Sequence, residues 1–312
     1  MPSAHSPNTL IARWPTVNPQ SALPLLVRTI TANLQGTSLG RRALHIRPLR
    51  LPPPKGAPQE QGRNLYVLRS LEGTQEQLAV VVEDPAAPLR NERADRDDDD
   101  DILLTDEDDP FQDEQQPHTR WTYSAIAVPS SSSASAPQNP SAHFDSFIQR
   151  VLVGAAPPSS THPLGSGPPS QPFWHPRPTA IFVECGAFAV STNPVTSPGS
   201  QDWLVKVGSV TVKGGTSSGT TRGCIIEVSY VPVPYLPASS TYVKDFLLAL
   251  FPAAAVRNRE IEVLDVKEED LVEAGVLEQP DKDKGEEEGE WEWRERHSLF
   301  SYVQQFKKEG LL

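Results

Sequence analysis

The sequence has few of the residues from which metal sites, disulfide frameworks and membrane spans are built. Only two of its 312 residues are cysteines, Cys185 and Cys224, and they lack the number and spacing that disulfide frameworks and zinc sites need. The seven histidines are scattered mostly through proline-rich stretches, with no pair at metal-ligand spacing. The best apolar run, Phe246 to Val256, is shorter than the roughly 18 residues of a membrane span. The composition therefore predicts no metal, no cofactor and no membrane contact.

Clusters of basic residues are also missing. The net charge is −12, but thirteen acids against two arginines lie between Glu92 and Glu114, and eight acids against four bases between Asp281 and Arg296. The remainder is close to neutral. Direct nucleic-acid binding requires a basic stripe that neutralises phosphates, so we expect none. The N-terminus has no charged segment followed by an apolar one, and no signal peptide is expected.

Proline, acids and serine are abundant instead, and they divide the chain. Proline accounts for 32 residues, about twice average usage. We expect one domain over residues 1–312, interrupted by segments that cannot bury enough apolar surface to offset chain entropy. These are a disordered acidic insertion at 84–118, Ser/Pro-rich low-complexity loops at 129–142 and 156–178, and an acidic loop at 279–297.

Between these segments the apolar pattern predicts more strands than helices. Alternating or β-branched runs predict eight strands: Leu10–Trp14, Ala43–Leu49, Asn64–Leu71, Gln77–Glu83, Trp121–Val128, Thr179–Val190, Trp203–Lys213 and Cys224–Val231. Stripes at helical spacing predict four helices: Leu23–Leu34, Phe144–Leu152, Tyr242–Phe251 and Leu299–Phe306. Most strands follow one another directly. The expected fold class is therefore α+β, an antiparallel, barrel-like eight-stranded sheet with packed helices and long disordered insertions. An open, strongly curved sheet is the alternative.

Candidate chemistry is sparse. The glycine-rich stretch from Gly214 to Gly223 has neither the GxxxxGK[ST] pattern nor a following helix, both of which a phosphate cradle needs. Glutamates at a spacing of two could line the lumen of a tunnel enzyme, and this spacing occurs at Glu260 and Glu262 and at Glu288, Glu290 and Glu292. The strongest predicted hairpin, however, contains a single glutamate, Glu227. We predict no catalytic, cofactor-binding or metal-binding residue. A barrel enzyme or small-ligand carrier of the triphosphate-tunnel type remains the alternative.

One segment carries a more specific pattern. The run DWLVKVGSVTV, from Asp202 to Val212, and the returning run RGCIIEVSYVPVPY resemble the signature hairpin of the Mediator subunit 20 family, also called the TATA-binding-protein-related factor family. The matching positions are Asp202, Trp203, Leu204, Val205, Lys206, Val207, Gly208, Arg222, Gly223, Ile226, Glu227, Val228 and Tyr230. The helix TYVKDFLLALF and the terminal helix SLFSYVQQF follow in the family's order. The long low-complexity insertions are similar to those of a fungal member.

This resemblance implies a function as well as a fold. It implies a barrel-like sheet paired with Mediator subunit 18 and anchored through subunit 8 to the head module, which contacts RNA polymerase II and general initiation factors. The implied role is a nuclear, non-catalytic coactivator scaffold, with the signature hairpin either structural or facing a partner. Trp203, Val205 and Val207 share one face of the hairpin's first strand, and we expect Trp203 to belong to the core.

Overall fold

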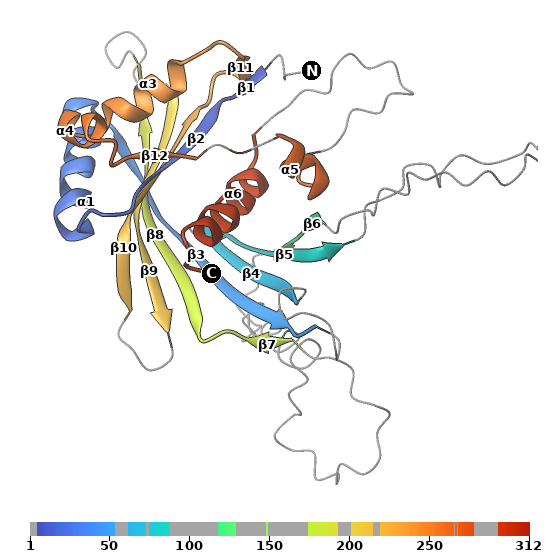
Figure 1. The fold of residues 1–312 in the computed structure, drawn as a ribbon. Helices are drawn as coiled ribbons and strands as arrows, with labels where there is room; N and C mark the ends of the chain where they lie inside the picture. Colours follow the sequence, from blue (N-terminus) through green and yellow to red (C-terminus); the bar gives the residue numbers. More distant parts are fainter. Residues whose placement is uncertain are drawn as a thin grey trace, which may run out of the picture.

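A computed structural model describes residues 5–53, 62–72, 75–87, 118–128, 148, 174–192, 201–214, 219–264, 266, 268–277 and 293–312. It confirms the expected fold class: a mixed α+β protein built on a large antiparallel sheet. This sheet has ten strands in the order β12-β2-β10-β9-β8-β3-β4-β5-β6, with β7 paired to β3. It runs from an edge at β12 to an edge at β6 and curves around the C-terminal helix, so it is open rather than closed (Figure 1).

The strands of the ten-stranded sheet include all eight that the sequence predicts. Their bounds are β2 Thr9–Trp14, β3 Thr37–Leu51, β4 Arg63–Glu72, β5 Gln75–Ala87, β6 His118–Val128, β7 His175–Pro176, β8 Thr179–Val190, β9 Trp203–Gly214, β10 Thr220–Tyr230 and β12 Glu262–Val263. A separate two-stranded sheet pairs β1, His5–Pro7, with β11, Tyr235–Pro237. The four short strands β1, β7, β11 and β12 were not predicted, because two or three residues carry no recognisable alternation.

The helices lie on both faces of the sheet. Their bounds are α1 Pro19–Arg28, continued by the π-helical turn η1 Thr29–Asn33, α3 Tyr242–Ala249, α4 Ala253–Arg257, α5 Glu268–Glu273 and α6 Glu295–Lys308. In α1 the N-cap is Asn18, whose side chain accepts a hydrogen bond from the Gln20 backbone at 3.0 Å, so this helix begins earlier than predicted. None of the helices that the structure describes has the length and apolar character that crossing a membrane requires.

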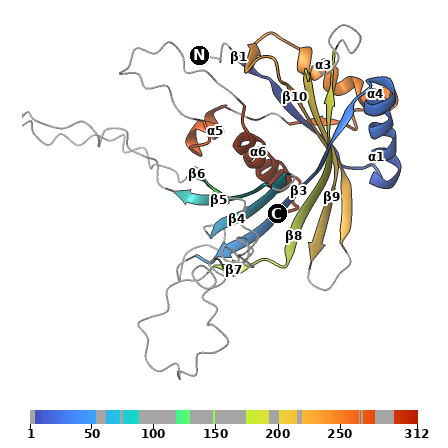
Figure 2. The same cartoon turned by 180° about the vertical axis from the view of Figure 1, so that it is seen from behind.

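Two hydrophobic clusters lie on opposite faces of the sheet. On the outer face, α1, α3 and α4 cover β2, β8, β9 and β10 (Figure 1). Trp203, Leu26 and Leu247 are among the buried residues of this cluster. On the inner, concave face, α6 packs against residues of β2, β10, β9, β8, β3, β4, β5 and β6. Residues 264 and 268–277, which include α5, cover the side of α6 that faces away from the sheet (Figure 2). This double cover explains why every residue from His297 to Val303 is buried.

The signature hairpin lies inside the sheet, with β2 on one side and β8 on the other. Strands β9 and β10 pair from Trp203 and Tyr230 onward, and the register shifts between Thr221 and Cys224. Gly223 lies in this bulge with φ +73°, and a Cβ there would lie 2.1 Å from the Trp14 carbonyl oxygen. Glycine is required at this position, because a side chain would meet both a steric block and a strained backbone.

Several predicted segment boundaries were wrong. The acidic insertion cannot span 84–118, because β5 continues to Ala87 and β6 already begins at His118, and these strands pair with each other. The loop at 156–178 ends earlier, since β7 pairs with β3. The acidic loop at 279–297 also ends earlier, because α6 begins at Glu295. Residues 129–142 and most of the predicted helix at 144–152 lie outside the described residues. Ile148 is described, and it is buried against Leu49, Leu65 and Val67.

Candidate functional site

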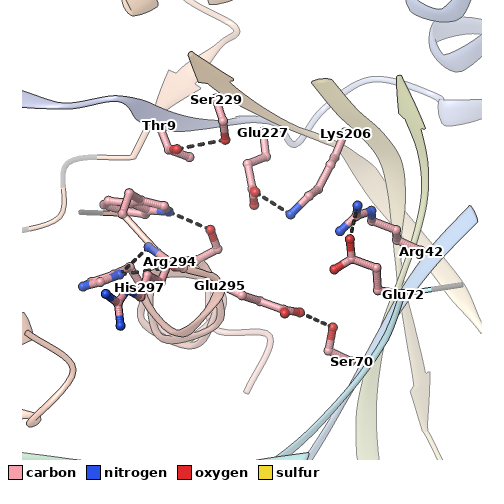
Figure 3. A network of polar contacts seen from close by, with 12 residues as sticks. Thr9, Arg42, Ser70, Glu72, Lys206, Glu227, Ser229, Arg294, Glu295 and His297 are labelled. Carbon is pink, nitrogen blue, oxygen red and sulfur yellow. Dashed lines mark hydrogen bonds and ion pairs between the residues drawn. The ribbon is translucent and has the colours of Figure 1, made fainter. Parts of the chain in front are cut away.

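The concave face carries a buried ion pair that comes from the signature hairpin. Lys206 on β9 and Glu227 on β10 are directly opposite each other, so both side chains lie on the same face of the sheet. Lys206 Nζ donates to Glu227 Oε1 at 2.7 Å, and Tyr302 on α6 donates its hydroxyl to Glu227 Oε2 at 2.5 Å. Figure 3 shows the Glu227 carboxylate directed at the Lys206 ammonium, and Glu227 is only 3% exposed. This carboxylate therefore joins the hairpin to the terminal helix.

The surroundings of this ion pair keep it charged. Burial alone raises the pKa of Glu227, but the Lys206 charge and hydrogen bonds from Lys206, Tyr302 and Ser298 more than offset that effect and hold the pKa below its usual value. Burial lowers the pKa of Lys206, and the ion pair with Glu227 more than reverses this. Burial and the neighbouring Glu227 raise the pKa of Tyr302 well above 10. At neutral pH the cluster consists of a cation, a carboxylate and a neutral phenol.

A small cavity of about 40 Å³ lies beside this cluster, and polar side chains from the sheet and α6 line it. Ser70 on β4 donates to Glu295 of α6 at 2.6 Å, and Arg42 on β3 forms an ion pair with Glu72 (Figure 3). Such a volume, with polar groups around it, suits a buried water but not a nucleotide or a metabolite.

Two further polar clusters fix the C-terminal end of α6. Arg13 on β2 is fully buried, and its guanidinium binds both carboxylate oxygens of Glu309, at 2.8 and 2.7 Å. It also donates to the carbonyl oxygens of Cys224 and Arg222 at 2.8 Å. On the opposite side, the buried carboxylate of Glu83 accepts a hydrogen bond from Tyr66 at 2.9 Å and pairs with Lys307.

The concave face therefore uses its charged groups to hold the chain's own helix. In each of the three clusters the strand residue, Glu227, Arg13 or Glu83, binds a residue of α6 or the residue that caps it. Burial raises the pKa of the Cys185 thiol to about 12 and that of Cys224 to about 11, so neither thiol is a thiolate at neutral pH. Within the described residues, no group of three or more His, Cys, Asp or Glu side chains is placed to hold a metal ion.

The residues of the signature hairpin separate into three structural roles. Trp203, Val205, Val207, Ile226 and Val228 are buried in the outer cluster beneath α1 and α3, where Tyr230 packs against the Trp203 ring. Lys206 and Glu227 point toward α6 on the other face.

The other hairpin residues shape the backbone or lie at its ends. Gly208 packs so closely on Cys185 that a Cβ would lie 2.3 Å from its Sγ. Asp202 accepts a hydrogen bond from the Thr192 backbone at 2.6 Å, Leu204 is half-buried, and Arg222 is exposed at the bulge beside Gly223. The structure brings together Lys206 and Glu227 but spreads the others over both faces.

Sequence reasoning missed the residues that complete the clusters. Arg13, Glu83 and Glu309 had no motif around them, and Arg13 lies 296 residues from Glu309 along the chain. A charged residue inside an otherwise apolar strand, as Arg13 is in TLIARW, was the only available signal. Of the glutamates considered for a tunnel enzyme, Glu260 accepts a hydrogen bond from the Trp14 indole at 3.1 Å. Glu262 lies 3.4 Å from Gln305, and Glu288, Glu290 and Glu292 are outside the described residues.

The buried His297 at the start of α6 gives a prediction for pH. Its Nδ1 accepts a hydrogen bond from the Arg294 backbone at 2.8 Å, and burial lowers the pKa of the imidazole from 6.5 to about 4. Between about pH 6.5 and pH 4, His297 is protonated in the unfolded chain but stays neutral in the folded protein. The free energy of unfolding is therefore unaffected by protonation of His297 above pH 6.5 and decreases progressively as the pH falls below that value. We expect a loss of about 2 kcal/mol by pH 5.

Urea unfolding at pH 7.5 and pH 5, for the wild type and for His297→Asn, measures this loss. Asparagine keeps an acceptor near the position of Nδ1 but does not titrate. The wild type should therefore lose about 2 kcal/mol more than the variant between the two pH values. Equal losses would show that the imidazole of His297 titrates normally in the folded protein.

No family model matches the chain, and no curated protein matches its sequence. Among solved structures, a protein of Pyrococcus horikoshii OT3 is similar at 9% identity and a TM-score of 0.30, over 85% of this chain and 96% of that one. A conserved hypothetical protein of Pyrococcus furiosus is similar at 8% identity and a TM-score of 0.30, over 85% of this chain and 94% of that one. Similarity at this level identifies no function for the present chain.

Proposed function

We propose that this protein is a non-catalytic subunit of the Mediator head module, of the subunit 20 family, and that it acts as a coactivator scaffold in the nucleus. Its proposed partners are Mediator subunits 18 and 8 and, through them, RNA polymerase II and the general initiation factors. It binds neither nucleic acid nor membranes directly in this proposal. The resemblance of the hairpin from Asp202 to Tyr230 to the family signature supports the choice of family.

One structural observation supports the non-catalytic part of the proposal most directly: α6 fills the concave face of the sheet. A tunnel enzyme needs that face open and lined with groups that bind substrate. Here Leu299, Phe300, Val303 and Phe306 of α6 pack into it as part of the core. The charged groups around them, Glu227, Arg13 and Glu83, are bound to the helix or to its cap. A scaffold whose interior is filled by its own side chains fits this arrangement.

Reconstitution with the proposed partners tests the function. The chain is co-expressed with subunits 18 and 8 from the same organism and analysed by affinity capture and size-exclusion chromatography. We expect the three chains to elute together as one complex. A chain that melts cooperatively on its own but binds neither subunit, separately or together, would refute the proposed partners.

The purified chain is also assayed for triphosphate hydrolysis, alone and in the complex with subunits 18 and 8. We expect no release of phosphate from inorganic triphosphate or nucleoside triphosphates in the presence of Mg²⁺ or Mn²⁺. The control is Glu227→Gln, which removes the one carboxylate of the hairpin that lies on the concave face. Hydrolysis by the wild type that this substitution abolishes, in a variant that still melts cooperatively above the assay temperature, would favour the triphosphate-tunnel alternative over the scaffold.

A further inference from the structure

A groove of about 400 Å³ opens on the outer side of the sheet where β8 ends and β9 begins. Three elements meet there: the end of η1, the last residues of β8 with the first of β9, and the first turn and a half of α3. The lining residues are Asn33, Leu34, Gln35, Val190, Ser191, Thr192, Trp203, Tyr242, Asp245 and Phe246. The groove lies on the opposite face of the sheet from the ion pair of Lys206 and Glu227.

One side of the groove is an aromatic surface. The Trp203 and Phe246 rings stack at 3.9 Å with an angle of 9° between their planes, and Tyr242 lies 5.1 Å from Trp203. Trp203 is buried, whereas Tyr242 is 43% exposed although it is a large ring on a helix that covers the core. Val231, which is 54% exposed, lies at the same end of the hairpin, since its backbone donates to the carbonyl of Asp202. Solvent-exposed aromatic surface around a hollow is typical of protein interaction sites.

The charge of the groove has one sign. Asp245 is the charged residue of the described lining, and it is exposed, with the Thr241 hydroxyl donating to its carboxylate at 2.7 Å. A second carboxylate, that of Asp202, lies next to the lining because it accepts a hydrogen bond from the Thr192 backbone. The groove thus offers a ring surface beside carboxylates, and this combination attracts cations and repels phosphates and acidic peptides.

We propose that this groove is a docking site for a basic segment of a partner protein, which places an arginine or lysine side chain across the face of Tyr242 with its charged end at Asp245. Arginine fits best, because its planar guanidinium stacks on an aromatic ring and binds a carboxylate at the same time. The neighbouring apolar surface of Leu34 and Val190 accommodates the alkyl stem or an adjacent apolar side chain. This inference does not depend on the Mediator assignment.

Binding of two peptide pools to the full chain tests the proposal. Both pools are fluorescein-labelled nonamers with a central residue between two leucines and with flanking positions mixed from alanine, serine and glycine. The central residue is arginine in one pool and glutamate in the other. By fluorescence anisotropy the arginine pool should bind about tenfold more tightly, because only its charge complements the groove.

Single substitutions then locate the site. Asp245→Asn and Tyr242→Leu should each weaken binding of the arginine pool about threefold or more, and Tyr242→Phe, which keeps the ring, should leave binding unchanged. Glu184→Gln is the matched control, because Glu184 is an exposed acid elsewhere on β8 and its loss changes the net charge equally. Unchanged melting temperatures show that each variant is folded.

Three results would overturn the proposal. The first is no difference between the two pools on the wild type, which would show that charge does not select the partner. The second is tight binding of the arginine pool that Asp245→Asn and Tyr242→Leu leave unchanged, which would place the contact elsewhere. The third is an equal loss of binding in Glu184→Gln, which would show non-specific attraction by the acidic chain.

Discussion

Replacing Glu227 with glutamine should lower the free energy of unfolding by about 3–5 kcal/mol. The glutamine side chain keeps the shape of the carboxylate, but it leaves the Lys206 ammonium on the concave face without its counter-ion. The Lys206 side chain is 16% exposed and that of Glu227 is 4% exposed, so water replaces the lost carboxylate only in part. The same change weakens the hydrogen bond from Tyr302, which anchors α6 to the hairpin.

Urea unfolding at neutral pH of Glu227→Gln, Lys206→Met and the double variant Lys206→Met/Glu227→Leu measures this effect. In the double variant both charges are gone, and two apolar side chains pack against α6 instead. Its loss should therefore be much smaller than the sum of the losses of Lys206→Met and of a Glu227→Leu single variant measured in parallel. A loss below about 1 kcal/mol for Glu227→Gln would contradict burial of the pair, because such values are typical of exposed ion pairs.

Much of the sheet could be predicted from the sequence because its strands are long and strongly patterned. In β8, the run TAIFVECGAFAV has β-branched and aromatic residues on both faces, and its bounds were predicted without error. The other long strands were located but extend by one to several residues further in the structure, and β10 ends at Tyr230, one residue before its predicted end. The extensions, such as the start of β3 at Thr37, contain glycine, serine and arginine and are largely exposed. Backbone pairing with β8 determines that extension, and side-chain pattern gives no indication of it.

The candidate site was less accessible to sequence reasoning because its contacts join distant parts of the chain. Glu227 and Tyr302 are 75 positions apart, and Glu83 and Lys307 are 224 apart. From sequence alone, a glutamate in a strand and a lysine near the end of a helix are each expected to be exposed to solvent. Only the curvature of the sheet around α6 brings such residues together. The aromatic groove was equally hidden, since Asn33, Thr192 and Asp245 come from three separate segments.

Truncation of Trp203 to alanine should cost about 3–5 kcal/mol of unfolding free energy. The indole is 2% exposed, and its centroid lies 3.9 Å from that of the Phe246 ring and 4.8 Å from that of the Tyr230 ring. It is therefore part of the outer core, as expected from the face that it shares with Val205 and Val207. Removing it leaves a cavity beneath α3 that the stacked Phe246 ring cannot fill without losing its own contacts.

Two measurements on Trp203→Ala separate a core residue from a partner-binding residue. Thermal and urea unfolding report the core, and capture of subunit 18 reports the proposed interface. If Trp203 is core, stability falls by the stated amount, and Trp203→Phe recovers part of it by restoring a ring against Phe246. Binding of subunit 18 should then be lost only in proportion to the fraction unfolded. Full stability combined with lost capture would instead make Trp203 an interface residue and would contradict the burial of its indole beneath α3.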